Sequence, residues 1–316
     1  MSELENDVEI VKYKEPETSK KKKIEDDSKE ISQRSSQKID VSSHNKDTLK
    51  KKNDLVFENN VNNVNADCST IESLKNMFAI MTEIIIKQEA DILEAVTGCQ
   101  EPNNYKIYGK TKEGDKIPMF KCKEYSGCAM RYFCPVSCRE FVMKIQSMTE
   151  EEEEEEEKES EKEDSYDNPV IIINKNFRCP VLCCIRPKMR IIFTVNEQKI
   201  GIIEQGFSFL DPIFYIYDDK DKPRYYIEAD CCQCGLMCRN NFLGKTDEAH
   251  FFIYHYDDRS NPAGDICKKA AKSMFSLADD YSVILPTDAT FEDKVLLMIA
   301  GIMIDYQYFE MNTDAK

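Results

Sequence analysis

The sequence contains no apolar segment long enough to cross a bilayer as a helix. Its longest uncharged run holds ten residues, Val295 to Ile304. Ten helical residues extend about 15 Å, whereas the hydrocarbon core of a bilayer is about 30 Å thick. The run is apolar on every side, so a helix here must be enclosed by protein or by lipid. Its shortness favours enclosure by protein.

An N-terminal apolar segment of the kind that begins a secretory signal peptide is also lacking. We therefore expect the chain to be made and kept in the cytosol. Proteins of that compartment rarely form disulfides, so most of the fourteen cysteines should be thiols.

Catalytic motifs are missing as well. Gly244-Lys245-Thr246 ends like a phosphate-binding loop, but Arg239 stands where its first glycine is required. Gly206 to Leu210 lacks the final glycine of a nucleophile elbow. Of only three histidines, His250 and His255 flank an expected strand, and their spacing puts them on opposite faces. We expect no enzymatic site and no nucleotide hydrolysis.

The chain has little positive charge relative to negative, and its net charge of −16 argues against nucleic-acid binding. The segment 1–68 is polar and carries only two aromatic residues, so it should be a disordered tail. Its lysine clusters, Lys20 to Lys23 and Lys50 to Lys52, are either solvated or in contact with anionic inner-leaflet lipid.

A helix is predicted after this tail. Ser69 and Glu72 form a capping box, and Gly98 is suited to a C-terminal cap. The apolar positions between them follow helical spacing and should bury one face: Ile71, Leu74, Phe78, Met81, Ile85, Ile92 and Val96.

Short segments rich in aromatic and β-branched residues come next, separated by turn-forming residues, and they predict strands. They are Tyr105–Tyr108, Phe141–Ile145, Val170–Asn174, Arg190–Val195, Gly201–Glu204, Phe214–Tyr217, Tyr225–Glu228 and Phe251–Tyr256. Many short strands followed by one apolar helix suggest a mostly β fold, a closed antiparallel barrel around the helix. We expect one domain over residues 69–310, with a disordered acidic insertion at 148–168 that contains the run Glu150 to Glu157.

Three cysteines form the first candidate site. Cys179, Cys183 and Cys184 lie among basic residues that lower thiol pKa and favour S-acylation at an anionic surface. Two acyl chains would give stable attachment to a membrane. The alternative is unmodified thiols.

A second cysteine cluster contains Cys231, Cys232, Cys234 and Cys238. Cys231 and Cys234 have the spacing of half a zinc site, and the other half could come from Cys122, Cys128, Cys134 and Cys138. The spacings among these last four cysteines are irregular, so we do not expect zinc. Acylation and plain thiols are the other readings of this cluster.

Oxygen ligands for calcium gather near the C-terminus, at Asp279, Asp280, Tyr281, Ser282 and Asp288. They do not match an EF-hand. The alternative is a polar loop that leads into the last strand and helix, with Asp288 or Thr290 as the helix cap. The apolar helix itself is marked by Val295, Leu296, Ile299, Ile302, Ile304 and Asp305. Inside a barrel, Asp305 should lie at the mouth, paired or hydrated.

The order of these segments resembles the phospholipid scramblase family over roughly residues 71–310. The family's C-terminal pattern is matched by Ala278, Asp279, Tyr281, Leu285, Pro286, Asp288, Ile304, Asp305, Phe309 and Glu310. Upstream, Gln88, Leu93, Glu94, Thr97, Gly98, Asn104 and Tyr105 look like its opening helix and first strand, and Gly201 and Ile203 match a Gly-x-(Val/Ile) segment. The chain departs from the pattern at Leu277, in lacking a proline-rich tail and in its acidic insertion.

The resemblance implies a tubby-like barrel, palmitoylation at Cys179, Cys183 and Cys184, and a calcium segment that contains Asp279. It also implies ATP-independent, bidirectional, calcium-responsive movement of phospholipids at the cytosolic face of the plasma membrane. An alternative of another class is an acyl-anchored module that recognises lipid head groups or proteins, with the tail and the acidic insertion recruiting protein partners.

Overall fold

A computed structural model describes residues 70–89, 102–135, 138–149, 166, 168–178, 186–208, 210–233, 236, 248–269 and 280–309. All of them belong to one unit, Phe57–Lys316. The strands are β1 (Met81–Glu89), β2 (Asn104–Thr111), β3 (Lys116–Tyr125), β4 (Phe141–Ser147), β5 (Ile171–Lys175), β6 (Lys188–Phe193), β7 (Gln198–Gln205), β8 (Ile213–Tyr217), β9 (Pro223–Glu228), β10 (Ala249–His255), β11 (Gly264–Lys268) and β12 (Asp280–Ile284). The helices are α2 (Ile71–Ile80), α4 (Cys128–Phe133), α7 (Phe291–Ile304) and the π-helix η2 (Asp305–Phe309).

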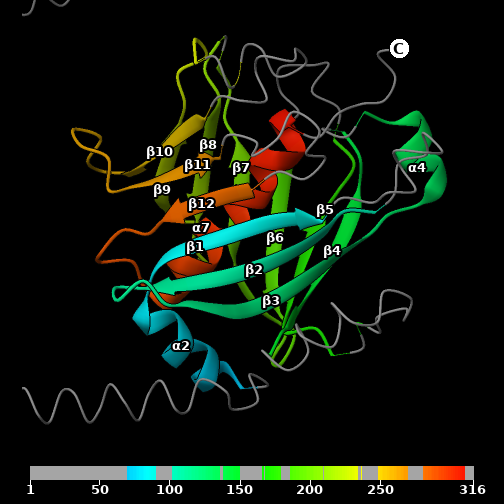
Figure 1. Ribbon diagram of the computed structural model, residues 1–316. Coiled ribbons are helices and arrows are strands. Elements are labelled where there is room, and N and C mark those ends of the chain that lie inside the picture. Colours follow the sequence, from blue (N-terminus) through cyan, green and yellow to red (C-terminus); the bar gives the residue numbers. More distant parts are fainter. Residues whose placement is uncertain are drawn as a thin grey trace, which may run out of the picture. The chain divides into compact units, whose positions relative to one another are not determined.

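The strands form one closed antiparallel barrel. Each pairs with its neighbours in chain order, and β1 closes the barrel by pairing with both β2 and β12 (Figure 1). The register places Ile86 of β1 between Ile107 of β2 and Tyr281 of β12. The predicted mostly β fold, a closed antiparallel barrel around an apolar helix, is confirmed.

Helix α7 fills the barrel. Figure 1 shows it, in orange and red, behind β12 and β1. Every residue from Val295 to Ile304 is buried, which explains why the sequence has no polar stripe there. Side chains alternate along each strand, so that one face of the barrel wall packs on α7. Strand β7 comes especially close to the helix, because a Cβ atom at Gly201 would lie 2.9 Å from Leu296 Cδ1.

Helix α7 begins with a capping box. Thr290 accepts a hydrogen bond from the backbone N–H of Asp293, and Asp293 accepts one from the backbone N–H of Thr290. Thr290 was one of the two caps predicted.

Helix α2 packs near the start of α7. Phe78 of α2 stacks edge-on against Phe291 of α7 at 5.5 Å between ring centroids. Lys294 donates hydrogen bonds to the carbonyl oxygens of Phe78 at 2.7 Å and Met81 at 3.0 Å. These carbonyls end α2, so a cation satisfies them and fixes α2 to α7. Burial lowers the pKa of Lys294, and the nearby Lys112 lowers it further.

The predicted extent of the first helix is wrong. Helix α2 ends at Ile80, and Ile85 lies in strand β1. The run Ile84-Ile85-Ile86 is β-branched and pairs on both sides, so tertiary pairing overrides the apparent helical period. The cap is also shifted, since Thr70 accepts the hydrogen bond from the Ser73 backbone N–H. The expected cap Ser69 and the expected end Gly98 lie outside the described residues, as do Ile92 and Val96.

Candidate functional site

Acidic side chains lie at both ends of the enclosed helix. At the C-terminal end, Asp305 has no exposed surface. Its carboxylate accepts hydrogen bonds from the hydroxyls of Tyr105 at 2.5 Å and Tyr281 at 2.6 Å. These two donors come from β2 and β12, so Asp305 joins strands on either side of β1. A buried carboxylate is costly unless hydrogen bonds satisfy it, and the two tyrosines meet that need.

A second buried carboxylate contacts Tyr306, the residue that follows Asp305. Glu124 of β3 accepts hydrogen bonds from Tyr306 Oη at 2.6 Å and from the backbone N–H of Asn103 at 3.0 Å. Arg139 Nη1 lies 3.6 Å from Glu124 Oε1, and both side chains are fully buried. This pair was not predicted from the sequence. One feature of the sequence could have indicated it: Glu124 lies on the same face of β3 as the buried Cys122 and Phe120, because the three are spaced two residues apart.

The N-terminal end of the helix carries a matching ion pair. Arg224 of β9 donates to Asp293 from Nε at 3.2 Å and from Nη2 at 2.8 Å. Burial raises the pKa of Asp293, but hydrogen bonds from Arg224 and Thr290 outweigh it and lower that pKa below its ordinary 3.8. Polar contacts therefore hold α7 to the barrel wall at both ends.

These contacts leave the helix surrounded by protein. In the part of the chain that the structure describes, no helix has the length and apolarity to span a bilayer. The interior of the barrel is occupied by apolar side chains from β1 to η2.

The residues considered for calcium do not converge on one point. Asp280, Tyr281 and Ser282 follow one another along β12, so their side chains alternate between the two faces of the wall. Tyr281 points inward to Asp305, whereas the hydroxyl of Ser282 contacts Glu83. Asp288 lies beyond the other end of β12, with Oδ1 3.5 Å from His255 Nε2. Asp279 lies outside the described residues, and the calcium site stays a prediction.

The three cysteines considered for acylation, Cys179, Cys183 and Cys184, also lie outside the described residues. The residues that flank them are described. Arg178 donates from Nη1 to the carbonyl oxygen of Arg186 at 3.5 Å, which brings the two ends of this loop together. Phe177 and Phe207 are about half exposed, and the Arg186 guanidinium lies 5.9 Å from the centroid of the Phe207 ring. The base of the loop is therefore both basic and aromatic.

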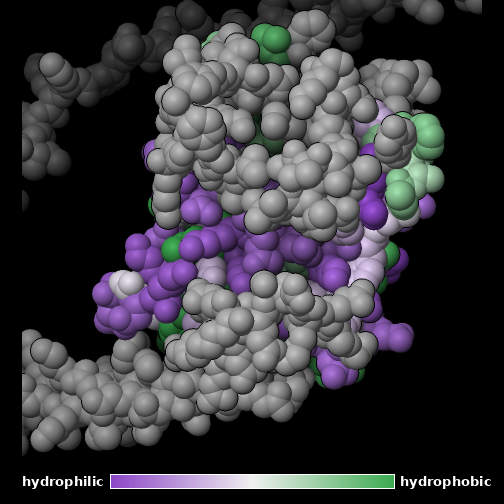
Figure 2. Space-filling view, turned by 45° about the vertical axis from the view of Figure 1, so that its right-hand side comes forward, coloured by the Kyte–Doolittle hydropathy of each residue, from purple (hydrophilic) through white to green (hydrophobic). Residues whose placement is uncertain are grey.

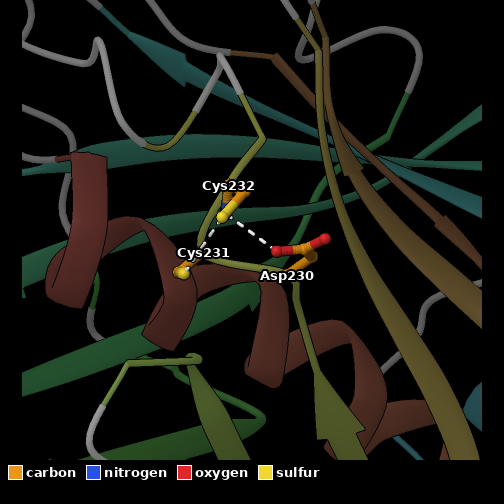
Figure 3. Close-up of side chains that lie close together, drawn as sticks. All are labelled: Asp230, Cys231 and Cys232. Atoms are coloured by element: carbon orange, nitrogen blue, oxygen red, sulfur yellow. Dashed lines mark hydrogen bonds between the residues drawn. The ribbon is translucent and has the colours of Figure 1, made fainter.

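Figure 3 draws two members of the second cysteine cluster, Cys231 and Cys232, together with Asp230. Cys231 and Cys232 place their sulfur atoms 3.7 Å apart, and the backbone N–H of Cys232 donates to Asp230 Oδ1 at 2.8 Å. The hydrogen bond with Cys232, together with burial, raises the pKa of Cys231 to about 11. Cys234 and Cys238 lie outside the described residues.

The other half proposed for that zinc site does not meet Cys231. Cys122 is buried in β3, and burial raises its pKa far above the ordinary value. Cys128 is exposed on α4, whereas Cys138 is buried. Among the described residues, no metal-binding group contains Cys122, Cys128, Cys134 or Cys138.

Lysines gather on the outer face of β1 to β4. Lys87 lies opposite Lys106, and Lys106 lies opposite Lys121, across three strands. Lys123 and Lys144 are opposite one another on β3 and β4. We call these five residues the lysine face. Figure 2 shows this side of the barrel, where the described residues are largely hydrophilic.

Like charges directly opposite one another are destabilising, so this arrangement is costly without a counterpart. Part of the cost is offset within the protein. Glu89 pairs with Lys106 at 3.1 Å, and the ammonium groups of Lys121 and Lys123 lie 5.5 Å and 5.7 Å from the centroid of the Tyr166 ring. The lysine face was not predicted from the sequence, because it depends on strand register.

Comparisons with known proteins find similarity to phospholipid scramblases. The family model described as Scramblase matches residues 160–311. Phospholipid scramblase 1 of Homo sapiens is 25% identical over 232 residues, which cover 72% of this chain and 63% of that protein. Phospholipid scramblase 2 of Bos taurus is 23% identical over 234 residues, which cover 72% of this chain and 69% of that protein. Phospholipid scramblase family member 5 of Homo sapiens is 23% identical over 231 residues, covering 72% and 73%. No solved structure matches the chain significantly.

Proposed function

We propose that the chain, which is similar to phospholipid scramblases over 72% of its length, moves phospholipids between the two leaflets of a membrane. One observation carries the proposal: the Scramblase match over residues 160–311 takes in β5 to η2, including the enclosed helix. Human phospholipid scramblase 1 is matched over less than two thirds of its length, so its activity is extended to this chain as a proposal.

The proposed movement uses no ATP and runs in both directions. The sequence supports this, because its nearest approach to a phosphate loop has Arg239 in place of the first glycine. Calcium would act through the predicted segment from Asp279 to Asp288. Three carboxylates, of which Asp288 is largely exposed, would give weak affinity and hence a response only to raised calcium.

The route that we propose lies outside the barrel. Because α7 is enclosed, a head group cannot pass along it, and lipid must cross at the outer surface where the bilayer is locally thinned. The partly exposed members of the lysine face, Lys87, Lys106, Lys123 and Lys144, would collect anionic head groups, since each lysine near an anionic surface contributes about 1 kcal/mol. Acyl chains on Cys179, Cys183 and Cys184 would hold the barrel at the cytosolic face of the plasma membrane.

Reconstitution tests the activity and the route together. The full chain is incorporated into anionic liposomes with fluorescent lipid in both leaflets, and a membrane-impermeant quencher reports how much lipid reaches the outside. Transport should quench more than half of the label, and calcium should accelerate it. The double substitution Asp279→Ala and Asp288→Ala should remove the calcium response.

A charge-matched pair of variants tests the lysine face. Lys87→Gln with Lys123→Gln should slow transport in anionic liposomes. Lys220→Gln with Lys222→Gln removes the same charge from the exposed β8–β9 turn and should leave transport unchanged. Equal slowing by both pairs would show that only net charge matters.

The enclosed helix also favours a second candidate, an acyl-anchored module that binds lipid head groups or proteins at the membrane surface. Such a module would bind the same liposomes but move no lipid. The fluorescent lipid of the inner leaflet would then remain unquenched at every calcium concentration. That result would refute lipid transport by the chain alone and support the module.

A further inference from the structure

A group of side chains that could hold a metal ion lies on the outer face of the barrel, at one end of β10 and β11. His250 and Cys267 are directly opposite one another in the antiparallel register. Their chain neighbours Phe251 and Ile266 are fully buried in the barrel interior. Because side chains alternate along a strand, His250 and Cys267 share the outer face. Glu248 is two residues before His250, so it belongs to the same face.

The three side chains converge on one point. His250 Nε2 lies 3.7 Å from Glu248 Oε2 and 3.9 Å from Cys267 Sγ. All three potential ligand atoms lie within 4.8 Å of one another. A tetrahedral zinc ion at ordinary bond lengths separates its ligand atoms by about 3.3–3.6 Å. The two distances from His250 Nε2 are therefore within a few tenths of an ångström of that geometry.

The histidine is already oriented for such a role. Its other ring nitrogen, Nδ1, lies 2.8 Å from Asp265 Oδ2 of β11. The Gln233 side chain binds both the backbone N–H and the carbonyl oxygen of His250, at 2.7 Å and 2.8 Å. A carboxylate on the far nitrogen is the usual support for a metal-bound histidine, because it fixes the tautomer and the ring plane.

We propose that Glu248, His250 and Cys267 bind a divalent metal ion of zinc type, with Asp265 as the positioning residue for His250. One sulfur, one imidazole nitrogen and one carboxylate oxygen are a donor set that suits zinc and cobalt and is poor for calcium or magnesium. Glu248 and His250 are partly exposed, which leaves a solvent path for the ion and for a water molecule as fourth ligand. The ion would join β10 to β11.

Metal binding would release the proton of the Cys267 thiol, because a coordinating thiol is deprotonated. Burial, with Glu248 as the next largest cause, raises the pKa of Cys267 to about 11, so the ion would have to displace a firmly held proton.

The neighbouring group of Asp230, Cys231 and Cys232 is the natural comparison. Its members are consecutive residues, and the Asp230 carboxylate already accepts a hydrogen bond from the Cys232 backbone. It has no histidine with a supporting carboxylate. The same assay can therefore distinguish the two groups.

The test is a cobalt titration of the purified, reduced full chain, followed by the near-ultraviolet absorption of a thiolate–cobalt bond and then by zinc displacement. The wild-type chain should show this absorption, and zinc should remove it. Cys267→Ser and His250→Gln should each lose it, whereas Cys231→Ser with Cys232→Ser should keep it. Asp265→Asn should weaken binding by about 10- to 100-fold without changing the spectrum.

Circular dichroism checks that each variant retains the barrel, and Glu248→Gln offers a milder change if Cys267→Ser does not fold. Weaker cobalt binding by a folded Glu248→Gln supports the site. The proposal is overturned if the wild-type chain binds neither ion. It is also overturned if the absorption survives in Cys267→Ser or disappears only when Cys231 and Cys232 are replaced.

Discussion

Gly301 offers the most direct test of whether α7 is enclosed by the barrel. A Cβ atom at this position would lie 2.7 Å from Ile86 Cδ1 of β1 and 3.5 Å from Val283 Cγ2 of β12. The first distance is well inside van der Waals contact, so Gly301→Leu would force four carbon atoms into a filled space. A helix surrounded by lipid would accept the same change, because leucine is more apolar and a better helix former than glycine.

The size of the effect follows from two opposing contributions. Overpacking a core costs typically about 1–3 kcal/mol, and four added carbons belong at the upper end or beyond. Leucine recovers about 1 kcal/mol of helix propensity relative to glycine. The net loss in unfolding free energy should therefore be about 2 kcal/mol or more. For a domain of this size, that is a fall of about 4–8 °C in Tm.

A double-mutant cycle identifies the contact that causes the loss. Ile86→Ala removes the atoms nearest to Gly301 and should by itself cost about 2–5 kcal/mol, since Ile86 is fully buried. The two changes together should cost less than their sum by about 1–3 kcal/mol. Ile284→Ala is the matched control, because Ile284 is half exposed on the outer face of β12. Its effect should add to that of Gly301→Leu within about 0.5 kcal/mol.

The measurement is urea unfolding of the purified chain, followed by circular dichroism in the absence of lipid. Unchanged stability in Gly301→Leu would contradict the packing described here. Equal coupling to Ile86 and to Ile284 would show that the loss arises elsewhere than at the contact between α7 and β1.

Three further predictions concern the polar ends of α7 and its approach to the wall. Arg139→Met leaves the Glu124 carboxylate buried without its ion pair and should lower the unfolding free energy by about 3–5 kcal/mol, measured by urea unfolding. Adding Glu124→Gln to this variant removes the unpaired charge and should restore much of the lost stability. The folded pKa of Asp293 is lowered, so its stabilising effect is present above pH 3.8 and is lost as the pH falls through the folded pKa. Asp293→Asn removes this charge and weakens the pair with Arg224. The difference in unfolding free energy between wild type and Asp293→Asn should therefore shrink on acidification below pH 4. A difference that stays constant with pH would exclude this linkage. Gly201→Ala should lower Tm by several degrees, because its Cβ would lie 2.3 Å from a carbonyl oxygen of β8 that cannot move aside, and an unchanged Tm would refute this close approach.

Much of the fold could be predicted from the sequence, because apolar alternation marks a half-buried strand. All eight predicted strands lie largely within β2 and β4 to β10. The strand β3 was missed because Lys116, Lys121 and Lys123 obscure its alternation. The strand β1 was assigned to a helix because Met81 and Ile85 also fit a period of 3.6, and only the paired strands on both sides decide between the two.

The polar contacts were much less predictable. The contact of Asp305 with Tyr105 joins residues that are 200 positions apart, and that of Tyr306 with Glu124 joins residues 182 apart. Their meeting depends on the register of a closed barrel, which local patterns do not encode. The same holds for the lysine face and for the pair of His250 and Cys267, which are neighbours only through strand pairing.

The order of elements along the chain has a consequence for biosynthesis. Helix α7 follows all twelve strands, and β12 must arrive before β1 can find its second partner. At a translation rate of roughly 5–20 residues per second, the ribosome needs on the order of ten seconds to travel from β1 to α7. During that interval the apolar side chains that will face α7 are not covered, and the edges of the unfinished sheet are unpaired. A chaperone should therefore bind the emerging polypeptide until its final helix leaves the exit tunnel and enters the barrel.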